Sequence, residues 1–180
     1  AAFYKEAMPS MGVAGATQLH GKELSYNNLL DLDAALEIVR DFDVPAAVVI
    51  KHNNPCGAAV GESLYTATEK AMAGDPLSAF GSVLGFNRVV DEQTAEFLAA
   101  PGLFIEAIVA PEFSAGAIGI LTTKPKWRNN VRLMQVGNLD QRDTELVYRQ
   151  INGGMLVQES DTVADDYSTW EVVTKTQPDD

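Results

Sequence analysis

The chain has 180 residues, 46% of them hydrophobic and 21% charged, and its formal net charge is −12. This length allows one domain with a substantial core, and the composition is typical of a globular protein and excludes a disordered one. The negative charge argues against a nucleic-acid surface, which needs a basic patch to neutralise phosphates, but it does not exclude a small anionic ligand.

Cys56 is the only cysteine, which excludes a disulfide framework and a cysteine-rich zinc site. No apolar run approaches the length of a membrane span, and the N-terminal residues lack the basic-then-apolar pattern of a signal peptide. We therefore expect a soluble, cytoplasmic protein with neither nucleic acid nor membrane among its partners.

Helix-like and strand-like patterns alternate along the chain as far as about residue 136. The first 24 residues are mixed in character, and we expect them to run over the surface. Apolar residues at helical spacing predict helices at about 32–42, 64–74, 91–99 and 113–122. Apolar runs predict strands at 46–51, 81–86, 103–110 and 131–136. Shorter strand-like pieces follow around 146–149, 155–158 and 170–175, with turn residues at 152–154.

This alternation predicts an α/β fold with three layers, α/β/α. Right-handed crossovers would place helices on both faces of a largely parallel sheet, and the last short strands would form an antiparallel addition. The run Ala46–Ile50 is apolar throughout, which is typical of a parallel strand that is covered on both faces. Such sheets bind ligands beyond the carboxyl ends of their strands, so the residues that follow Ile50 are candidates for a site.

The segment Lys51–Gly57 reads Lys-His-Asn-Asn-Pro-Cys-Gly and follows this strand directly. Successive strand residues point to opposite faces, so Lys51 and His52 share a site only if the chain leaves the sheet between or just after them. Asn53-Asn54-Pro55 suits such a turn. A lysine favours the neutral form of a neighbouring imidazole, which can accept a proton, and its ammonium can stabilise an oxyanion. The alternative is a solvated lysine beside a hydrogen-bonded turn histidine, and the pattern alone does not separate the two.

Three other segments carry polar groups whose role stays open at this level. Glu106 lies in an apolar strand run, so its carboxylate must be paired, hydrogen-bonded or directed into a site, unless the strand is an edge that faces water. Asp75–Gly81 ends in a glycine that could let a ligand approach the backbone, although a simple connection between helix and strand explains it better in isolation. Asn28 could bind a ligand, but a local helix cap explains it better.

Two motifs that involve Cys56 are incomplete. Pro55-Cys56 is typical of the zinc-deaminase signature, but Ala59 stands where the second cysteine is required, and no His-x-Glu precedes it. A catalytic cysteine needs a base, and only His52 is near it in the sequence. We therefore expect no metal and interpret Cys56 as a small packed residue. A zinc-dependent deaminase is the alternative, which metal analysis would test.

Several segments together resemble the AICAR transformylase domain of the bifunctional purine-biosynthesis family, which joins AICAR transformylase to IMP cyclohydrolase. They occur in the family's order across nearly the whole chain, and Asn-Pro-Cys-Gly after Lys-His is closer to the bacterial-type version. The matching segments are Gln18–Asn28, Lys51–Gly57, Asp75–Gly81, Gly85–Arg88, Ile108–Pro111, Asn152–Gln158 and Val172–Lys175. The resemblance implies a mixed sheet like that of a cytidine deaminase without zinc, a three-layer unit that the family contains twice.

The resemblance also implies a reaction, the transfer of a formyl group from 10-formyltetrahydrofolate to the 5-amino group of 5-aminoimidazole-4-carboxamide ribonucleotide (AICAR). No metal takes part in it. By position, His52 is similar to the family's proton acceptor and Lys51 to its transition-state stabiliser. The other positions carried over are Gly81, Glu106 and Asn28 for the nucleotide, and Leu77 and Phe80 for the folate.

Compared with that family, residues 1–180 correspond to one domain, the first deaminase-like half of the transformylase region. The second half and the cyclohydrolase domain are absent, and the family's sites form between the subunits of a homodimer. We therefore expect little or no transformylase activity from this piece alone. The alternative is a non-catalytic module of the same fold that binds a nucleotide.

Overall fold

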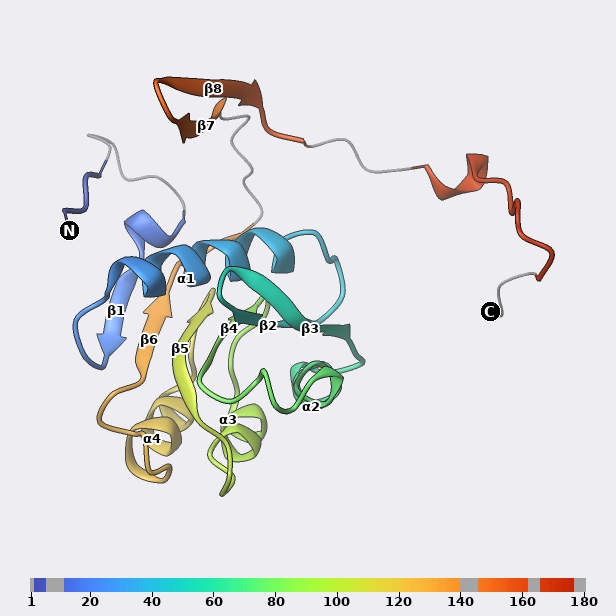
Figure 1. The fold of residues 1–180 in the computed structure, drawn as a ribbon. Helices are drawn as coiled ribbons and strands as arrows, with labels where there is room; N and C mark the ends of the chain where they lie inside the picture. The colour runs from blue at the N-terminus through green and yellow to red at the C-terminus, as the bar shows by residue number, and fades with distance from the viewer. Residues whose placement is uncertain (1, 6–11, 140–145, 162–165, 177–180) are drawn as a thin grey trace. The chain divides into compact units, whose positions relative to one another are not determined.

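The structure, a computed structural model, describes residues 2–5, 12–139, 146–161 and 166–176 (Figure 1). Its contacts divide the chain into two compact units, Ala1–Gln141 and Arg142–Asp180. The described part of the first unit contains a six-stranded sheet with α-helices packed on it, and that of the second contains a two-stranded sheet.

The sheet of the first unit has the strand order β1-β6-β5-β4-β2-β3. Its strands are β1 (Thr17–His20), β2 (Ala46–Lys51), β3 (Asn54–Val60), β4 (Ser82–Phe86), β5 (Ile105–Ala110) and β6 (Arg132–Gln135). The helices are α1 (Tyr26–Val39), α2 (Leu64–Gly74), α3 (Glu92–Leu98) and α4 (Ala115–Thr123), and a 3-10 turn, η1 (Val13–Gly15), precedes β1.

Helices cover both faces of this sheet, as the α/β prediction requires. Leu32 and Leu36 of α1 pack in one buried cluster with Val48 and Ile50 of β2. Residues of α2, α3 and α4 pack in a second cluster with the alternate residues of the same strand, Ala47 and Val49. The two clusters lie on opposite faces because successive strand side chains point in opposite directions. The predicted three-layer α/β/α arrangement is confirmed (Figure 1).

The direction of β2 differs from the prediction. β4, β5 and β6 are parallel, but β2 pairs antiparallel with both β3 and β4, and β1 pairs antiparallel with β6. The sheet is therefore mixed, as the family resemblance implies, and the prediction of a parallel strand at residues 46–50 was wrong. Burial on both faces makes a strand apolar throughout, whatever the direction of its neighbours, so the apolar run could not reveal this.

The sequence pattern missed two strands. β1 lies within the N-terminal segment that was expected to run over the surface, and three of its four residues are exposed. β3 contains Pro55 and Gly57, which indicate a turn, yet it is an edge strand where proline is tolerated. Pairing shifts by one residue between Val49↔Gly57 and Ile50↔Pro55, so Cys56 is the extra residue of a β-bulge.

The predicted helices are all present, each with a side-chain cap. Ser25, Ser63, Asp91 and Ser114 accept hydrogen bonds from the first turns of α1 to α4 in order. α1 begins at Tyr26, six residues before the predicted start, because Ser25 and Asn28 form a reciprocal capping box ahead of the apolar pattern.

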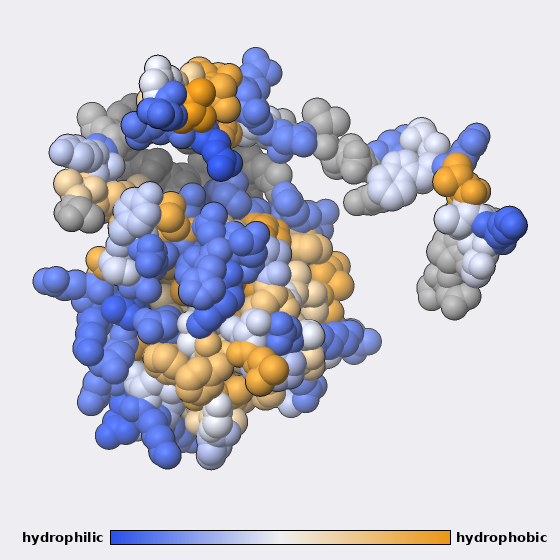
Figure 2. Space-filling model, viewed as in Figure 1, coloured by the Kyte–Doolittle hydropathy of each residue, from blue (hydrophilic) through white to orange (hydrophobic). Residues whose placement is uncertain are grey.

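The second unit contains the hairpin of β7 (Leu146–Ile151) and β8 (Gly154–Glu159), followed by η2 (Tyr167–Thr169). This confirms the predicted short antiparallel strands, with Asn152 and Gly153 in the turn and φ +79° at Gly153. The prediction of a strand around 170–175 was wrong, since those residues pair with no other strand. All residues of β7 and β8 are exposed. Figure 2 shows hydrophobic residues of this hairpin in orange.

No helix in the ranges that the structure covers is long and apolar enough to cross a membrane.

Gly57 provides a test of this packing. A Cβ there would lie 2.0 Å from the carbonyl oxygen of Ala71 in α2. We expect Gly57→Ala to destabilise the fold by about 1–3 kcal/mol, because α2 or β3 must move to relieve the clash. Gly119→Ala is the matched control, since a Cβ on that α4 residue would meet nothing within 4 Å. Urea unfolding should show a neutral or slightly stabilising effect for the control, and equal effects of the two substitutions would contradict this account.

Candidate active site

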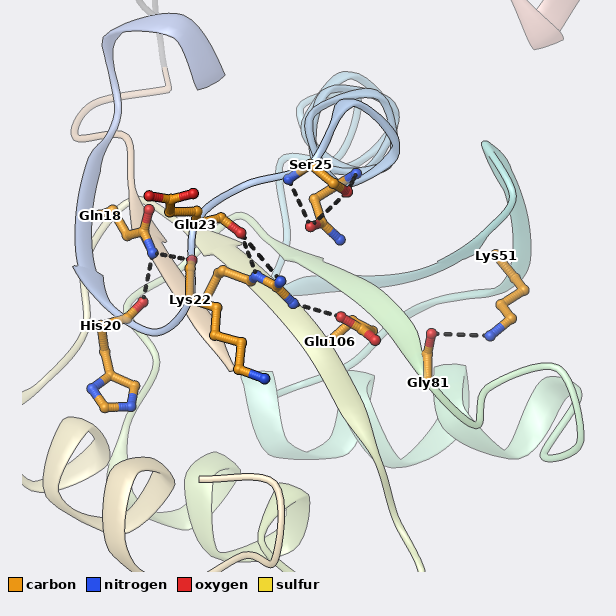
Figure 3. A network of polar contacts seen from close by, with 10 residues as sticks. Gln18, His20, Lys22, Glu23, Ser25, Lys51, Gly81 and Glu106 are labelled. Atoms are coloured by element: carbon orange, nitrogen blue, oxygen red, sulfur yellow. Dashed lines mark hydrogen bonds and ion pairs between the residues drawn. The ribbon is translucent and has the colours of Figure 1, made fainter. Parts of the chain in front are cut away.

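The end of β2 meets the beginnings of the parallel strands at one edge of the sheet. Ile50 of β2 pairs with Val83 near the start of β4, because the two strands run in opposite directions. Lys51, Gly81 and Glu106 consequently lie along the same edge, as Figure 3 shows. The predicted residues therefore follow the carboxyl end of β2, but they lie at the amino ends of β4 and β5.

The ammonium of Lys51 is held by backbone carbonyl groups. Its Nζ donates to the carbonyl oxygens of Phe80 at 2.9 Å and Gly81 at 3.0 Å. Gly81 has φ +71°, and a Cβ at this position would lie 3.3 Å from Nζ of Lys51 and 3.2 Å from the ring of Phe104. An ammonium has three donors, so one remains for a ligand after these two bonds. The backbone conformation favours glycine here, and a Cβ would also lie tightly against the lysine and Phe104.

His52 and Asn53 form the two-residue turn between β2 and β3. Their φ angles are +52° and +65°, which are the left-handed values that a type I′ hairpin turn requires at both central positions. The Asn53 N–H donates to Oδ1 of Asp31 in α1 at 2.7 Å, and Nδ2 of Asn54 donates to the His52 carbonyl at 3.1 Å. The turn thus begins directly after Lys51, and the prediction that Asn53-Asn54-Pro55 turns the chain out of the sheet was wrong.

Glu106 is paired with an arginine that the sequence analysis did not identify. Nη1 of Arg132, the first residue of β6, donates to Oε2 of Glu106 at 2.6 Å. Nε and Nη2 of Arg132 donate to the Glu23 carbonyl at 3.3 and 3.2 Å. The arginine side chain is 12% exposed and that of Glu106 37%, so the glutamate keeps access to a ligand.

A β-bulge sets the position of Glu106. Ser82 of β4 pairs with Ile105, and the next residue, Val83, pairs with Ala107, so Glu106 is the extra residue of β5. Such bulges change the direction of a side chain next to an active site. β5 lies between β4 and β6, which excludes the edge-strand alternative for Glu106.

Asn28 acts as a helix cap. Its Oδ1 accepts hydrogen bonds from the Ser25 N–H at 3.1 Å and the Ser25 hydroxyl at 2.9 Å, and the residue is buried. The capping alternative is therefore confirmed. Nδ2 of Asn28 makes no hydrogen bond within the described ranges, which leaves one donor group at the start of α1.

The loop before β4, whose Phe80 carbonyl binds Lys51, presents two apolar side chains. Leu77 is 91% exposed and Phe80 is 59% exposed, with the Phe80 ring 5.4 Å from that of Phe104. The Asp75 carboxylate accepts hydrogen bonds from the N–H groups of Leu77 and Ser78 and from the Ser78 hydroxyl. These bonds lower the pKa of Asp75, with the Ser78 hydroxyl the largest cause. The segment is the predicted connection from helix to strand, and it also offers an apolar surface.

Cys56 packs against the core, as predicted. It is partly buried, and its thiol donates to the Val49 carbonyl at 3.5 Å. The pKa of the Cys56 thiol is raised, mainly because the thiol is partly buried. The nucleophilic thiolate is therefore scarce near neutral pH. Among the residues whose positions are described, no three His, Cys, Asp or Glu side chains are grouped as metal ligands.

Arg132 and Asp31 are the two residues that the sequence analysis missed. Arg132 is the one cation in the apolar run 131–136, on the strand next to that of Glu106, and pairing those two charges would have identified it. Asp31 carries no comparable signal, because its contact joins a helix to a turn 22 residues away.

These observations define an α/β protein whose edge site combines an ammonium, an exposed histidine, a paired carboxylate and an apolar loop. Comparison with known families assigns the chain more narrowly. It matches the AICARFT/IMPCHase bienzyme family model over residues 1–180, and it belongs to that family.

Relatives in several bacteria carry the name bifunctional purine biosynthesis protein PurH. The chain is 62% identical over 181 residues to the protein from Rhodopirellula baltica, covering 100% of this chain and 35% of that protein. It is 44% identical over 183 residues to the protein from Caldicellulosiruptor saccharolyticus, and 48% identical over 180 residues to the protein from Desulfitobacterium hafniense. Each of these two matches covers 99% of this chain and 34% of the relative. The chain thus spans about a third of the length of these relatives.

Asp75 should determine the order of the apolar loop. Its lowered pKa means that its hydrogen bonds stabilise the folded loop fully above the ordinary value of 3.8, and that this stabilisation is lost as the pH falls through the lower folded pKa. We expect Asp75→Ala to speed hydrogen exchange of the Leu77 and Ser78 amides at pH 7. Asp43→Asn, another exposed aspartate, should leave both amides unchanged. Unchanged exchange in Asp75→Ala would show that the carboxylate does not hold the loop.

Proposed function

We propose that this chain is the first deaminase-like half of an AICAR transformylase domain, and that it contributes His52 and Lys51 to formyl transfer. The formyl group would pass from 10-formyltetrahydrofolate to the 5-amino group of AICAR, on the way to IMP. The family assignment over residues 1–180 supports this function. The observation that carries it is the hydrogen bond from Lys51, the residue before His52, to the Gly81 carbonyl, at the sheet edge where Glu106 also lies.

The reaction needs the two functions that this pair of residues offers. The AICAR amine is conjugated with an aromatic ring and a carboxamide, so it is a poor nucleophile and must lose a proton as it attacks the formyl carbon. His52 is exposed and its ring makes no hydrogen bond within the described residues, so it is available as the proton acceptor. The remaining donor of Lys51 stabilises the negative charge that develops on the formyl oxygen.

The neighbouring residues supply binding groups for the two substrates. Glu106 can accept hydrogen bonds from the nucleotide, because Arg132 occupies only Oε2 of its carboxylate. Gly81 lets a ligand approach the backbone, and Asn28 offers its free amide nitrogen. Leu77 and Phe80 form the apolar surface proposed for the folate.

The proposal assigns this chain only part of a site. In the resemblance, residues of a second deaminase-like half and of a second subunit complete it, and the intact protein is a cytoplasmic homodimer with IMP cyclohydrolase activity as well. Residues 1–180 purified alone should therefore give no turnover of AICAR with 10-formyltetrahydrofolate. Calorimetry on the same sample separates a nucleotide-binding module from an inert fragment, and robust turnover would contradict the assignment.

In the full-length protein, His52→Ala should lower the kcat of formyl transfer by about 10²- to 10⁴-fold, because a positioned general base contributes this much. Lys51→Met should also cause a large loss, whereas Lys70→Met, on the exposed surface of α2, is the matched control and should leave kcat unchanged. Nucleotide affinity, measured by calorimetry, should stay within about threefold for His52→Ala. Near-normal turnover by that variant would refute the role of His52.

A further inference from the structure

The turn that carries His52 has a backbone conformation that its sequence does not favour. Type I′ turns need positive φ at both central positions and prefer Asn-Gly or Gly-Gly. Here the positions hold His52 and Asn53, at φ +52° and +65°, and non-glycine residues rarely adopt two such values in succession. His and Asn tolerate positive φ better than other non-glycine residues, and a contact from outside the turn adds to the stability of this conformation.

Asp31 provides such a contact. Its Oδ1 accepts the Asn53 N–H at 2.7 Å, a short hydrogen bond whose acceptor is a carboxylate. The other contact at the turn, from Asn54 to the His52 carbonyl, is local to the hairpin. Asp31 lies on α1, so its bond fixes the turn relative to the body of the first unit. Asp31 also lies three residues after Asn28 on α1, so the two residues share one side of the helix.

The orientation of the imidazole depends on this backbone. The ring of His52 makes no hydrogen bond within the described part of the chain, so the main chain of the turn sets the direction of the Cα–Cβ bond from which the ring extends. If the turn relaxed to ordinary φ values, the direction of the His52 side chain would change. A displacement of about 1 Å at a reacting group can cost on the order of 10²-fold in rate.

We propose that Asp31 is a positioning residue, which holds the His52–Asn53 turn in its left-handed conformation and thereby aims the imidazole at the substrate amine. This inference rests on the proposed proton-acceptor role of His52. Asp31 itself contacts the backbone of the turn, and the role assigned to it acts through His52.

The test uses the full-length protein and formyl-transfer kinetics. Asp31→Ala should lower kcat by about tenfold or more and change KM for the nucleotide by less than about threefold. Asp31→Asn keeps an acceptor oxygen in the same place and should retain most of kcat. Asp33→Ala removes the same charge from an exposed position of the same helix and should leave kcat unchanged.

A rescue experiment separates positioning from general damage to the fold. Glycine favours the second central position of a type I′ turn, so Asn53→Gly should restore most of the kcat lost in Asp31→Ala. Absence of rescue, or an equal loss of kcat in Asp33→Ala, would overturn the proposal.

Hydrogen exchange of the Asn53 amide gives a readout that does not depend on turnover. Exchange should accelerate in Asp31→Ala and stay slow in Asp31→Asn. If the wild-type protein transfers no formyl group but shows this pattern, the proposed function fails and the contact between Asp31 and the turn stands. If the wild type is active and Asp31→Ala changes neither kcat nor exchange, the positioning role alone fails.

Discussion

The antiparallel pairing of β2 with β4 is the constraint on which the candidate site depends. It reverses one strand relative to β4, β5 and β6, so that the end of β2 reaches the beginnings of those strands. Lys51 thereby comes within hydrogen-bond distance of the backbone before β4, and the turn at His52 lies beside α1. In a wholly parallel sheet, Lys51 would lie at the opposite edge from the start of β4, and this combination could not form.

Backbone groups and paired charges hold the site in place. Carbonyl oxygens orient Lys51, a bulge orients Glu106, and a backbone amide joins the His52 turn to Asp31. Removing Glu106 would leave the mostly buried Arg132 without its counter-charge, which is costly in the interior of a protein. Gly81 is favoured at its position because its φ is +71° and a Cβ there would lie tightly against Lys51 and Phe104.

The sequence predicts the layers of the fold well, because apolar periodicity reports burial directly, although it places the start of α1 six residues too late. It does not predict the direction of β2, since a strand buried on both faces looks alike in parallel and antiparallel sheets. It misses β3 because Asn-Pro-Cys-Gly indicates a turn, and only the edge position explains these residues in a strand. Position at a strand end makes Lys51 and His52 candidates for the site, whereas the role proposed for Asp31 depends on a contact between distant segments that no local pattern encodes.

A crystal structure of the full-length protein with AICAR and an unreactive analogue of formyltetrahydrofolate is the most direct test of this account. In this complex we expect the 5-amino nitrogen of AICAR to lie within about 3.2 Å of a ring nitrogen of His52, with the formyl-equivalent oxygen facing Lys51. The nucleotide should contact Glu106 at the amino ends of β4 and β5. A nucleotide bound at the opposite edge, beyond Phe86 and Ala110, would contradict it.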